Sequence, residues 1–175
     1  LITGGAGFIG SHLALRLLEE GHQIRIIDNL SNCSESFMKS IPKEIEFNQM
    51  DLLTSDRLSA VVKGMDQVVH CAAHSEIKTI DFGQRPDFSS GLMGTYRLME
   101  AIRENPVAEF VFLSSSSVYG EANEKPTPES YGPLAPISTY AAAKIAAEAW
   151  CSAYGHSLGM KVTIFRLANI IGPRA

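Results

Sequence analysis

The chain has 175 residues, of which 45% are hydrophobic and 19% are charged, and its formal net charge is −4. This composition is typical of a single globular domain, and it argues against a disordered chain and against a basic nucleic-acid-binding protein. No apolar run approaches the roughly 20 residues of a membrane-spanning helix, and no secretory leader pattern opens the sequence, so we expect a cytoplasmic protein that binds neither membrane nor nucleic acid.

The first predicted elements are a short strand, a glycine-rich turn and a helix. Within residues 2–10, glycines stand at Gly4, Gly7 and Gly10. Gly4 would allow a sharp turn, Gly7 would let the backbone approach a phosphate, and Gly10 would let the helix pack closely on the sheet. Amides at the start of that helix would bind the anion. Glycine-rich turns are also common without a ligand, so this stretch is weak evidence when it stands alone.

The rest of the chain alternates strands with helices. Apolar runs predict strands at residues 24–27, 45–47, 67–73, 110–113 and 162–166, and helical spacing predicts helices at residues 9–20, 58–62, 92–102 and 139–157, with loops at 29–36, 74–90 and 121–136. This order predicts an α/β fold with a doubly wound parallel sheet, the Rossmann fold, over all of residues 1–175. Because both ends look cut, we expect a piece of a longer protein whose C-terminal substrate domain is missing.

Two aspartates follow predicted strands. Asp28 ends the second strand, near the position at which a dinucleotide-binding unit holds an adenosine ribose, and Asp51 follows the third strand. His70 is interpreted as packed at a strand end rather than catalytic. The three cysteines, Cys33, Cys71 and Cys151, are odd in number and lack CxxC spacing, so we expect reduced thiols and no metal site.

A second group of residues predicts acid–base chemistry. Tyr140 and Lys144 are four residues apart and share one face of the last predicted helix. A nearby cation stabilises phenolate, which suits proton transfer with an alcohol. Such pairs also occur on solvated helix faces without a function. Ser115, at the carboxyl end of a predicted strand, favours the catalytic interpretation, because ligands bind at that edge of open α/β sheets.

Together these segments resemble the extended short-chain dehydrogenase/reductases, specifically their NAD-dependent epimerase/dehydratase family. The matching motifs lie at residues 3–12, 28–31, 51–52, 70–73, 94–95, 114–120, 140–144 and 166–173. The similarity covers essentially the whole chain and is strongest to nucleotide-sugar 4-epimerases of the UDP-glucose type. It is much less specific for the substrate than for the family.

The resemblance implies NAD as the cofactor. The residues that would bind it are Gly4, Gly7, Phe8, Ile9 and Gly10 at the pyrophosphate, Asp28, Asn29, Leu30, Ser31 and Asn32 at the adenosine ribose, Asp51 and Leu52 at the adenine, and Cys71, Ala72 and Ala73 beside the central part. Asp28 favours NAD over NADP because a carboxylate repels a 2′-phosphate. Ser115, Tyr140 and Lys144 would be catalytic, with Tyr140 and Lys144 also touching the cofactor, and Ser115, Ser116, Tyr140 and Asn169 would contact the substrate.

The implied activity is transient oxidation of a UDP-sugar at C4, followed by reduction on the opposite face. A decarboxylase or reductase of the same family, or a non-catalytic NAD-binding sensor, are the alternatives. Ser116 and Ser117 stand where dehydratases carry Asp-Glu, which argues against a 4,6-dehydratase. Gly91 replaces a usual asparagine, so either Ser90 substitutes for it or NAD affinity falls. The family also implies a homodimer through the helices at 92–104 and 139–157.

Overall fold

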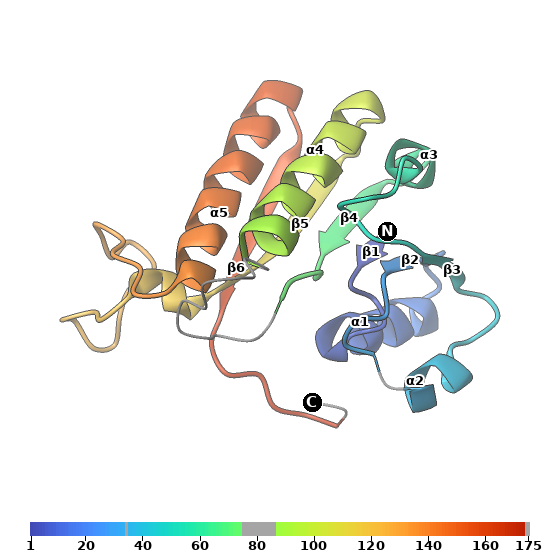
Figure 1. The fold of residues 1–175 in the computed structure, drawn as a ribbon, viewed down its shortest axis with the longest axis horizontal. Coiled ribbons are helices and arrows are strands. Elements are labelled where there is room, and N and C mark those ends of the chain that lie inside the picture. Colours follow the sequence, from blue (N-terminus) through green and yellow to red (C-terminus); the bar gives the residue numbers. More distant parts are fainter. Residues whose placement is uncertain (34, 75–86, 174–175) are drawn as a thin grey trace.

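Six parallel strands form one sheet in the computed structural model, which describes residues 1–33, 35–74 and 87–173 (Figure 1). The strands are β1 (Ile2–Thr3), β2 (Arg25–Asp28), β3 (Glu46–Gln49), β4 (Gln67–His70), β5 (Glu109–Ser115) and β6 (Lys161–Leu167). Their order across the sheet is β3-β2-β1-β4-β5-β6. The chain therefore winds outward from β1 in one direction and from β4 in the other, which confirms the doubly wound topology.

Helices cover both faces of the sheet. The α-helices are α1 (Phe8–Glu19), α2 (Glu35–Ser40), α3 (Leu58–Val62), α4 (Gly94–Glu104) and α5 (Thr139–Leu158); a π-helix, η1 (Asp87–Met93), leads into α4, and a 3₁₀ turn, η2 (Ser116–Tyr119), follows β5. One hydrophobic cluster joins α3, α4 and α5 to the sheet, and a second joins α1 to the opposite face. Figure 1 shows α4 and α5 side by side over β5 and β6. None of the described helices is long and apolar enough to cross a membrane.

The predicted elements differ from the observed ones mainly near the site. β4 ends at His70 rather than at residue 73: its pairing with β1 ends at Thr3 and its pairing with β5 ends at Phe112, although β5 itself continues to Ser115. Residues 35–40 form α2 where part of the predicted loop lay, and η1 replaces the end of the predicted loop at 74–90. Residues 75–86 of that loop lie outside the described part of the chain.

Small residues bring α1 onto the sheet, although the spacing of its apolar residues predicted the helix. Gly10, Ser11 and Ala14 are its buried residues, whereas Leu13 and Leu17 are only partly buried at the edge of the contact. A side chain larger than alanine at position 14 would hold the helix away from the sheet, because this residue is 0% exposed.

Candidate active site

A groove lies along the carboxyl ends of β1, β2 and β4, at the point where the strand order reverses. Its lining comprises Gly4, Gly7, Ile27, Asp28, Asn29, Ser31, Asn32, Met50, Asp51, Leu52, Leu53, Cys71, Ala72, Ala73, His74 and Ser90. Open α/β sheets bind ligands at this topological switch point. The groove thus gathers most of the residues that the sequence assigned to the cofactor.

The glycine turn is built by backbone packing that no side chain could share. Gly4 has φ of +66°, and a Cβ there would lie 2.7 Å from the backbone of Ala72. A Cβ on Gly10 would lie 2.2 Å from the carbonyl oxygen of Gly4. Gly10 therefore lets α1 pack directly against the turn that follows β1. Gly7 caps α1 and lines the groove, so the N-terminus of this helix, where the first amides have no acceptor within the helix, lies at the groove.

Two carboxylates shape the groove beyond the turn. Asp28 accepts a hydrogen bond from the amide of Ala6 (2.9 Å) through Oδ2 and one from the amide of Leu30 (2.7 Å) through Oδ1. Asp51 accepts from the side-chain amide of Asn29 at 2.8 Å. Because carboxylate oxygens can each accept more than one hydrogen bond, Asp28 keeps acceptor capacity for ribose hydroxyls. Leu30, at φ of 62°, is held in the left-handed region by its bond to Asp28.

A chain of hydrogen bonds fixes the strand ends below the groove. The Thr95 hydroxyl donates to the carbonyl of Gly91 at 2.5 Å, so it must accept from His70 Nε2 at 2.9 Å. His70 Nδ1 is then the acceptor for the hydroxyl of Thr3 at 2.6 Å, and Thr3 in turn accepts from the amide of Ala72. Burial, with the nearby charge of Lys144 as the smaller cause, lowers the pKa of His70 to about 3. The structure thus supports the packing interpretation of this histidine.

A smaller cavity continues from the groove toward the last helix. Ala73 and His74 line both spaces, and Gly91, Tyr140, Ala143 and Lys144 complete the smaller one. Tyr140 and Lys144 therefore both line one cavity. Among the described residues, His74 Nδ1 is buried without a hydrogen-bond partner, which is an orphan polar atom of the kind that a bound ligand satisfies.

Lys144 is a buried cation. Its side chain is 5% exposed, and Nζ donates to the carbonyl of Leu113 at 2.6 Å. Nζ also lies 4.8 Å from the ring centroid of Phe112 and 5.8 Å from that of Tyr140. Burial lowers the pKa of Lys144 to about 8, and nearby Cys71, Cys151 and Glu148 oppose that effect. The amine is thus mostly charged at pH 7 and can stabilise a phenolate.

The three cysteines form no disulfide with one another, in agreement with the predicted reduced thiols. Cys71 lines the groove, and burial raises its pKa to about 12, as it does for the buried Cys151. Both thiols therefore stay protonated at neutral pH. No group of three or more possible metal ligands is found within residues 1–33, 35–74 and 87–173.

Several predicted residues lie outside the two cavities. The described lining does not include Phe8, Ile9, Gly10, Leu30, Ser115, Ser116 or Asn169. Ser115 lies at the end of β5, where its Oγ accepts from the amide of Ser117 at 3.2 Å and from its hydroxyl at 2.9 Å. Asn169 is exposed, two residues beyond β6. The roles of these residues remain predictions.

The structure adds groove residues that the sequence analysis did not assign to the cofactor, namely Ile27, Met50, Leu53 and His74. Strand-end position is a signal for Ile27, but nothing in the sequence marks Leu53. Ser90, considered as a substitute for the missing asparagine, does line the groove. A Cβ on Gly91 would meet only the Cβ of Ala143, at 3.6 Å, so a side chain at position 91 would have space.

Comparisons with known proteins identify the family that the chain resembles. The family model of the NAD-dependent epimerase/dehydratase family matches residues 1–175. The chain is 35% identical to an uncharacterised UDP-glucose epimerase of Bacillus subtilis and 32% identical to a putative UDP-glucose 4-epimerase of Methanocaldococcus jannaschii, with 99% of this chain and 57% and 56% of those proteins covered. A UDP-glucuronic acid decarboxylase of Xenopus tropicalis is 29% identical over 99% of this chain and 41% of that protein.

Solved structures of UDP-sugar epimerases are also similar to this chain. The structure of the Thermus thermophilus UDP-glucose 4-epimerase in complex with NAD has a TM-score of 0.89 and 36% identity to this chain. The match covers 99% of this chain and 56% of that structure. A UDP-galactose 4-epimerase has a TM-score of 0.88 and 39% identity, with 99% and 57% covered. The chain spans a little over half the length of the two epimerase relatives and of these structures. By its sequence along all 175 residues and by its fold, it belongs to the NAD-dependent epimerase/dehydratase family.

Proposed function

We propose that the protein is an NAD-dependent nucleotide-sugar epimerase that oxidises a UDP-sugar transiently at C4. The observation that carries this proposal is the cavity that joins Tyr140 and Lys144 to the dinucleotide groove through Ala73 and His74. A sensor would need the groove but not a phenol beside a buried cation at its end. Similarity to solved UDP-sugar epimerases supports the choice of substrate class.

The chain's residues fit NAD at the groove. The turn of Gly4 and Gly7 would hold the pyrophosphate, and Asp28 would accept from the adenosine ribose. When bound, NAD supplies an acceptor and a donor of hydride. Lys144 would hold its charge near Tyr140 and bond the adjacent ribose.

Tyr140 would perform the proton transfer. As a phenolate stabilised by Lys144, it would accept the proton of the sugar C4 hydroxyl while hydride leaves C4. After the 4-keto sugar turns over in the site, Tyr140 would return that proton to the oxygen as hydride returns to the opposite face of C4. Proton and hydride are thereby both restored, so the sugar is epimerised with no net oxidation. Ser115 would orient the reacting hydroxyl.

The test uses the full-length protein with UDP-glucose or UDP-galactose and follows formation of the C4 epimer. We expect Tyr140→Phe to abolish turnover and to leave NAD bound, because the aromatic ring stays and only the proton carrier is lost. Tyr131→Phe, in the exposed loop before α5, serves as the matched control and should keep activity. NAD binding without turnover of any nucleotide sugar by the wild type would refute the proposal and favour a sensor.

A decarboxylase is the second candidate, because a UDP-glucuronic acid decarboxylase is among the relatives and the same C4 oxidation would precede loss of carboxylate. Release of CO₂ from UDP-glucuronic acid, without epimer from UDP-glucose, would identify it. Both candidates need Tyr140, so the substrate assay separates them and the variant does not.

We also propose a homodimer through α4 and α5. Tyr96 and Trp150 stack edge to face across the two helices, with ring centroids 5.5 Å apart, and Tyr154 extends the group. Trp150 is 42% exposed. Exposed aromatic side chains of this kind are typical anchors of protein interfaces. We expect Trp150→Glu to convert a dimer into a monomer in light scattering, and a monomeric wild type would contradict the proposal.

A further inference from the structure

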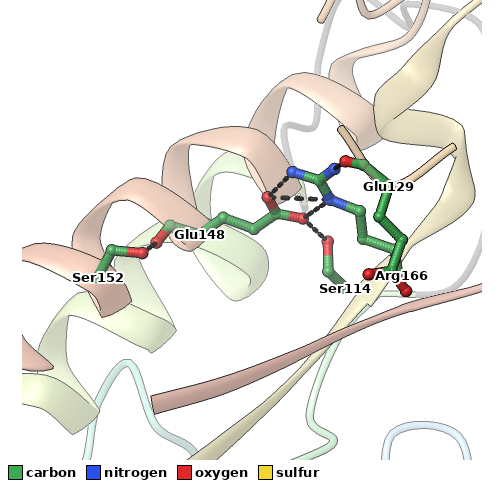
Figure 2. Close-up of polar contacts among 5 residues, drawn as sticks. All are labelled: Ser114, Glu129, Glu148, Ser152 and Arg166. Atoms are coloured by element: carbon green, nitrogen blue, oxygen red, sulfur yellow. Dashed lines mark hydrogen bonds and ion pairs between the residues drawn. The ribbon is translucent and has the colours of Figure 1, made fainter. Parts of the chain in front are cut away.

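Figure 2 shows an ion pair between Glu148 and Arg166. Glu148 follows Lys144 by one turn of α5, and neither member of the pair lines either cavity. Glu148, on α5, is 7% exposed. Two nitrogens of Arg166 approach its two carboxylate oxygens, with Nη2 at 2.8 Å from Oε2 and Nε at 3.1 Å from Oε1. The Ser114 hydroxyl donates to Oε1 at 2.5 Å. This carboxylate thus joins α5 to the ends of both β5 and β6.

Arg166 has further contacts on the side away from Glu148. Its Nη1 donates to the main-chain carbonyl of Glu129 at 3.3 Å, which fastens the loop that leads into α5. Its guanidinium carbon lies 4.9 Å from the ring centroid of Tyr119, in the 3₁₀ turn after β5. The bond to Glu148 is the main cause that raises the pKa of Arg166. A planar, always charged fork is suited to such a junction, which a lysine could not reproduce.

These contacts hold α5 against β5 at two successive residues. Lys144 bonds the carbonyl of Leu113, and Glu148 bonds the side chain of Ser114. The next residue is Ser115, which the proposed function assigns to the reacting hydroxyl. A slide of α5 by a fraction of a turn would break both contacts and would move Tyr140 relative to the strand end.

We propose that Glu148 and Arg166 are positioning residues that fix the register of Tyr140 and Lys144 against the end of β5. This inference rests on the proposed function, because it assumes that Tyr140, Lys144 and Ser115 act together. Glu148 does not touch the cavity and takes no proton from substrate. Its part is to keep the phenol and the ammonium in place.

The chain offers a matched control at the other end of the same two strands. Glu109 and Lys161 are register partners on β5 and β6, and their ion pair has an N···O distance of 2.7 Å. Ser114 and Arg166 are register partners at the opposite end. The control pair lies five residues before Ser114 on β5 and five residues before Arg166 on β6, and the Lys161 side chain is 71% exposed. Breaking the ion pair of Glu109 and Lys161 should affect only the contacts between strands at that end of the sheet.

The experiment compares Glu148→Gln, Arg166→Lys and Glu109→Gln in the full-length protein. Glu148→Gln keeps the size of the side chain and an oxygen for Ser114 but turns a donor group toward Arg166, and Arg166→Lys keeps the charge but not the fork. We expect both to lower kcat by about 10- to 100-fold with KM and NAD affinity within about twofold, because misplacement by about 1 Å costs this much when ground-state binding is kept. Glu109→Gln should leave kcat within about twofold.

A second measurement does not depend on activity. Amide hydrogen exchange of residues 139–147 should become faster in Glu148→Gln and Arg166→Lys without NAD or substrate, while residues 152–158 of the same helix exchange as in the wild type. Unchanged kcat and unchanged exchange in both variants would overturn the positioning role. Equal losses in Glu109→Gln, or faster exchange throughout the protein, would also overturn it, since they indicate general destabilisation. If the wild type has no epimerase activity, the proposed function fails, and the local exchange result still decides whether the pair holds α5.

Discussion

The buried charge of Lys144 predicts a pH-dependent stability. Lys144→Met keeps the length of the side chain and removes the charge. In the folded wild type, the pKa of the Lys144 amine is lowered from 10.5 to about 8. Below pH 8 the amine is protonated in both states, and burial of the charge then lowers the free energy of unfolding by about 3 kcal/mol. Between pH 8 and 10.5 the folded protein releases this proton and the unfolded chain keeps it, so the stability of the wild type rises with pH.

The variant lacks this rise. From pH 7 to pH 9.5, we expect the free energy of unfolding of the wild type to increase by about 2 kcal/mol relative to that of Lys144→Met. At pH 7 the substitution removes the cost of burying the charge but leaves the carbonyl of Leu113 without its donor, which costs about 1–3 kcal/mol. The variant should therefore be at least as stable as the wild type at pH 7, although it would be inactive.

Urea denaturation of the apo protein at four pH values between 7 and 9.5 measures the difference. Using the difference between wild type and variant cancels the titration of groups that both share. Lys161→Met, which removes an exposed lysine, is the control. A difference in the free energy of unfolding between wild type and Lys144→Met that stays constant with pH within about 0.5 kcal/mol would refute the reasoning. The cost of burying Lys144 must fall when its ammonium loses a proton and becomes a neutral amine.

Three further predictions concern residues in and around the groove. Gly10→Ala should lower the free energy of unfolding, measured by urea denaturation, by about 2 kcal/mol or more, since its Cβ would overlap backbone that cannot move aside. Gly91→Ala should change the free energy of unfolding by less than about 0.5 kcal/mol. Equal effects of the two substitutions would contradict the packing argument. Ser90→Ala should weaken NAD binding in calorimetry if Ser90 substitutes for the missing asparagine, and unchanged affinity would show that it does not. The low pKa of His70 means that the unfolded chain gains its proton first as the pH falls, so from pH 6.5 to 4.5 the wild type should lose about 2 kcal/mol of stability. His70→Leu should lack that loss, and an equal acid loss in both proteins would exclude His70 as its cause.

Local sequence determined the fold class and most of the dinucleotide groove. The glycines at 4 and 10 are required by backbone contacts, and these contacts depend on residues close in sequence or on one neighbouring strand end. Most strands and helices could be predicted, because the spacing of apolar residues reflects which side chains face the core. The errors are at the ends of elements and at α2, which was not predicted. The pairing of Tyr140 with Lys144 was also readable, because four residues along a helix bring two side chains to one face.

Only the tertiary structure decided what surrounds these groups. No sequence pattern connects Glu148 with Arg166 or Ser114, which come from three elements and are up to 52 residues apart along the chain. Nor could it show that the pKa of Lys144 is lowered, because desolvation depends on how closely β5 and α5 pack. Periodicity specifies which face of an element is buried, whereas the partner of a buried charge is fixed by how separate elements meet in space.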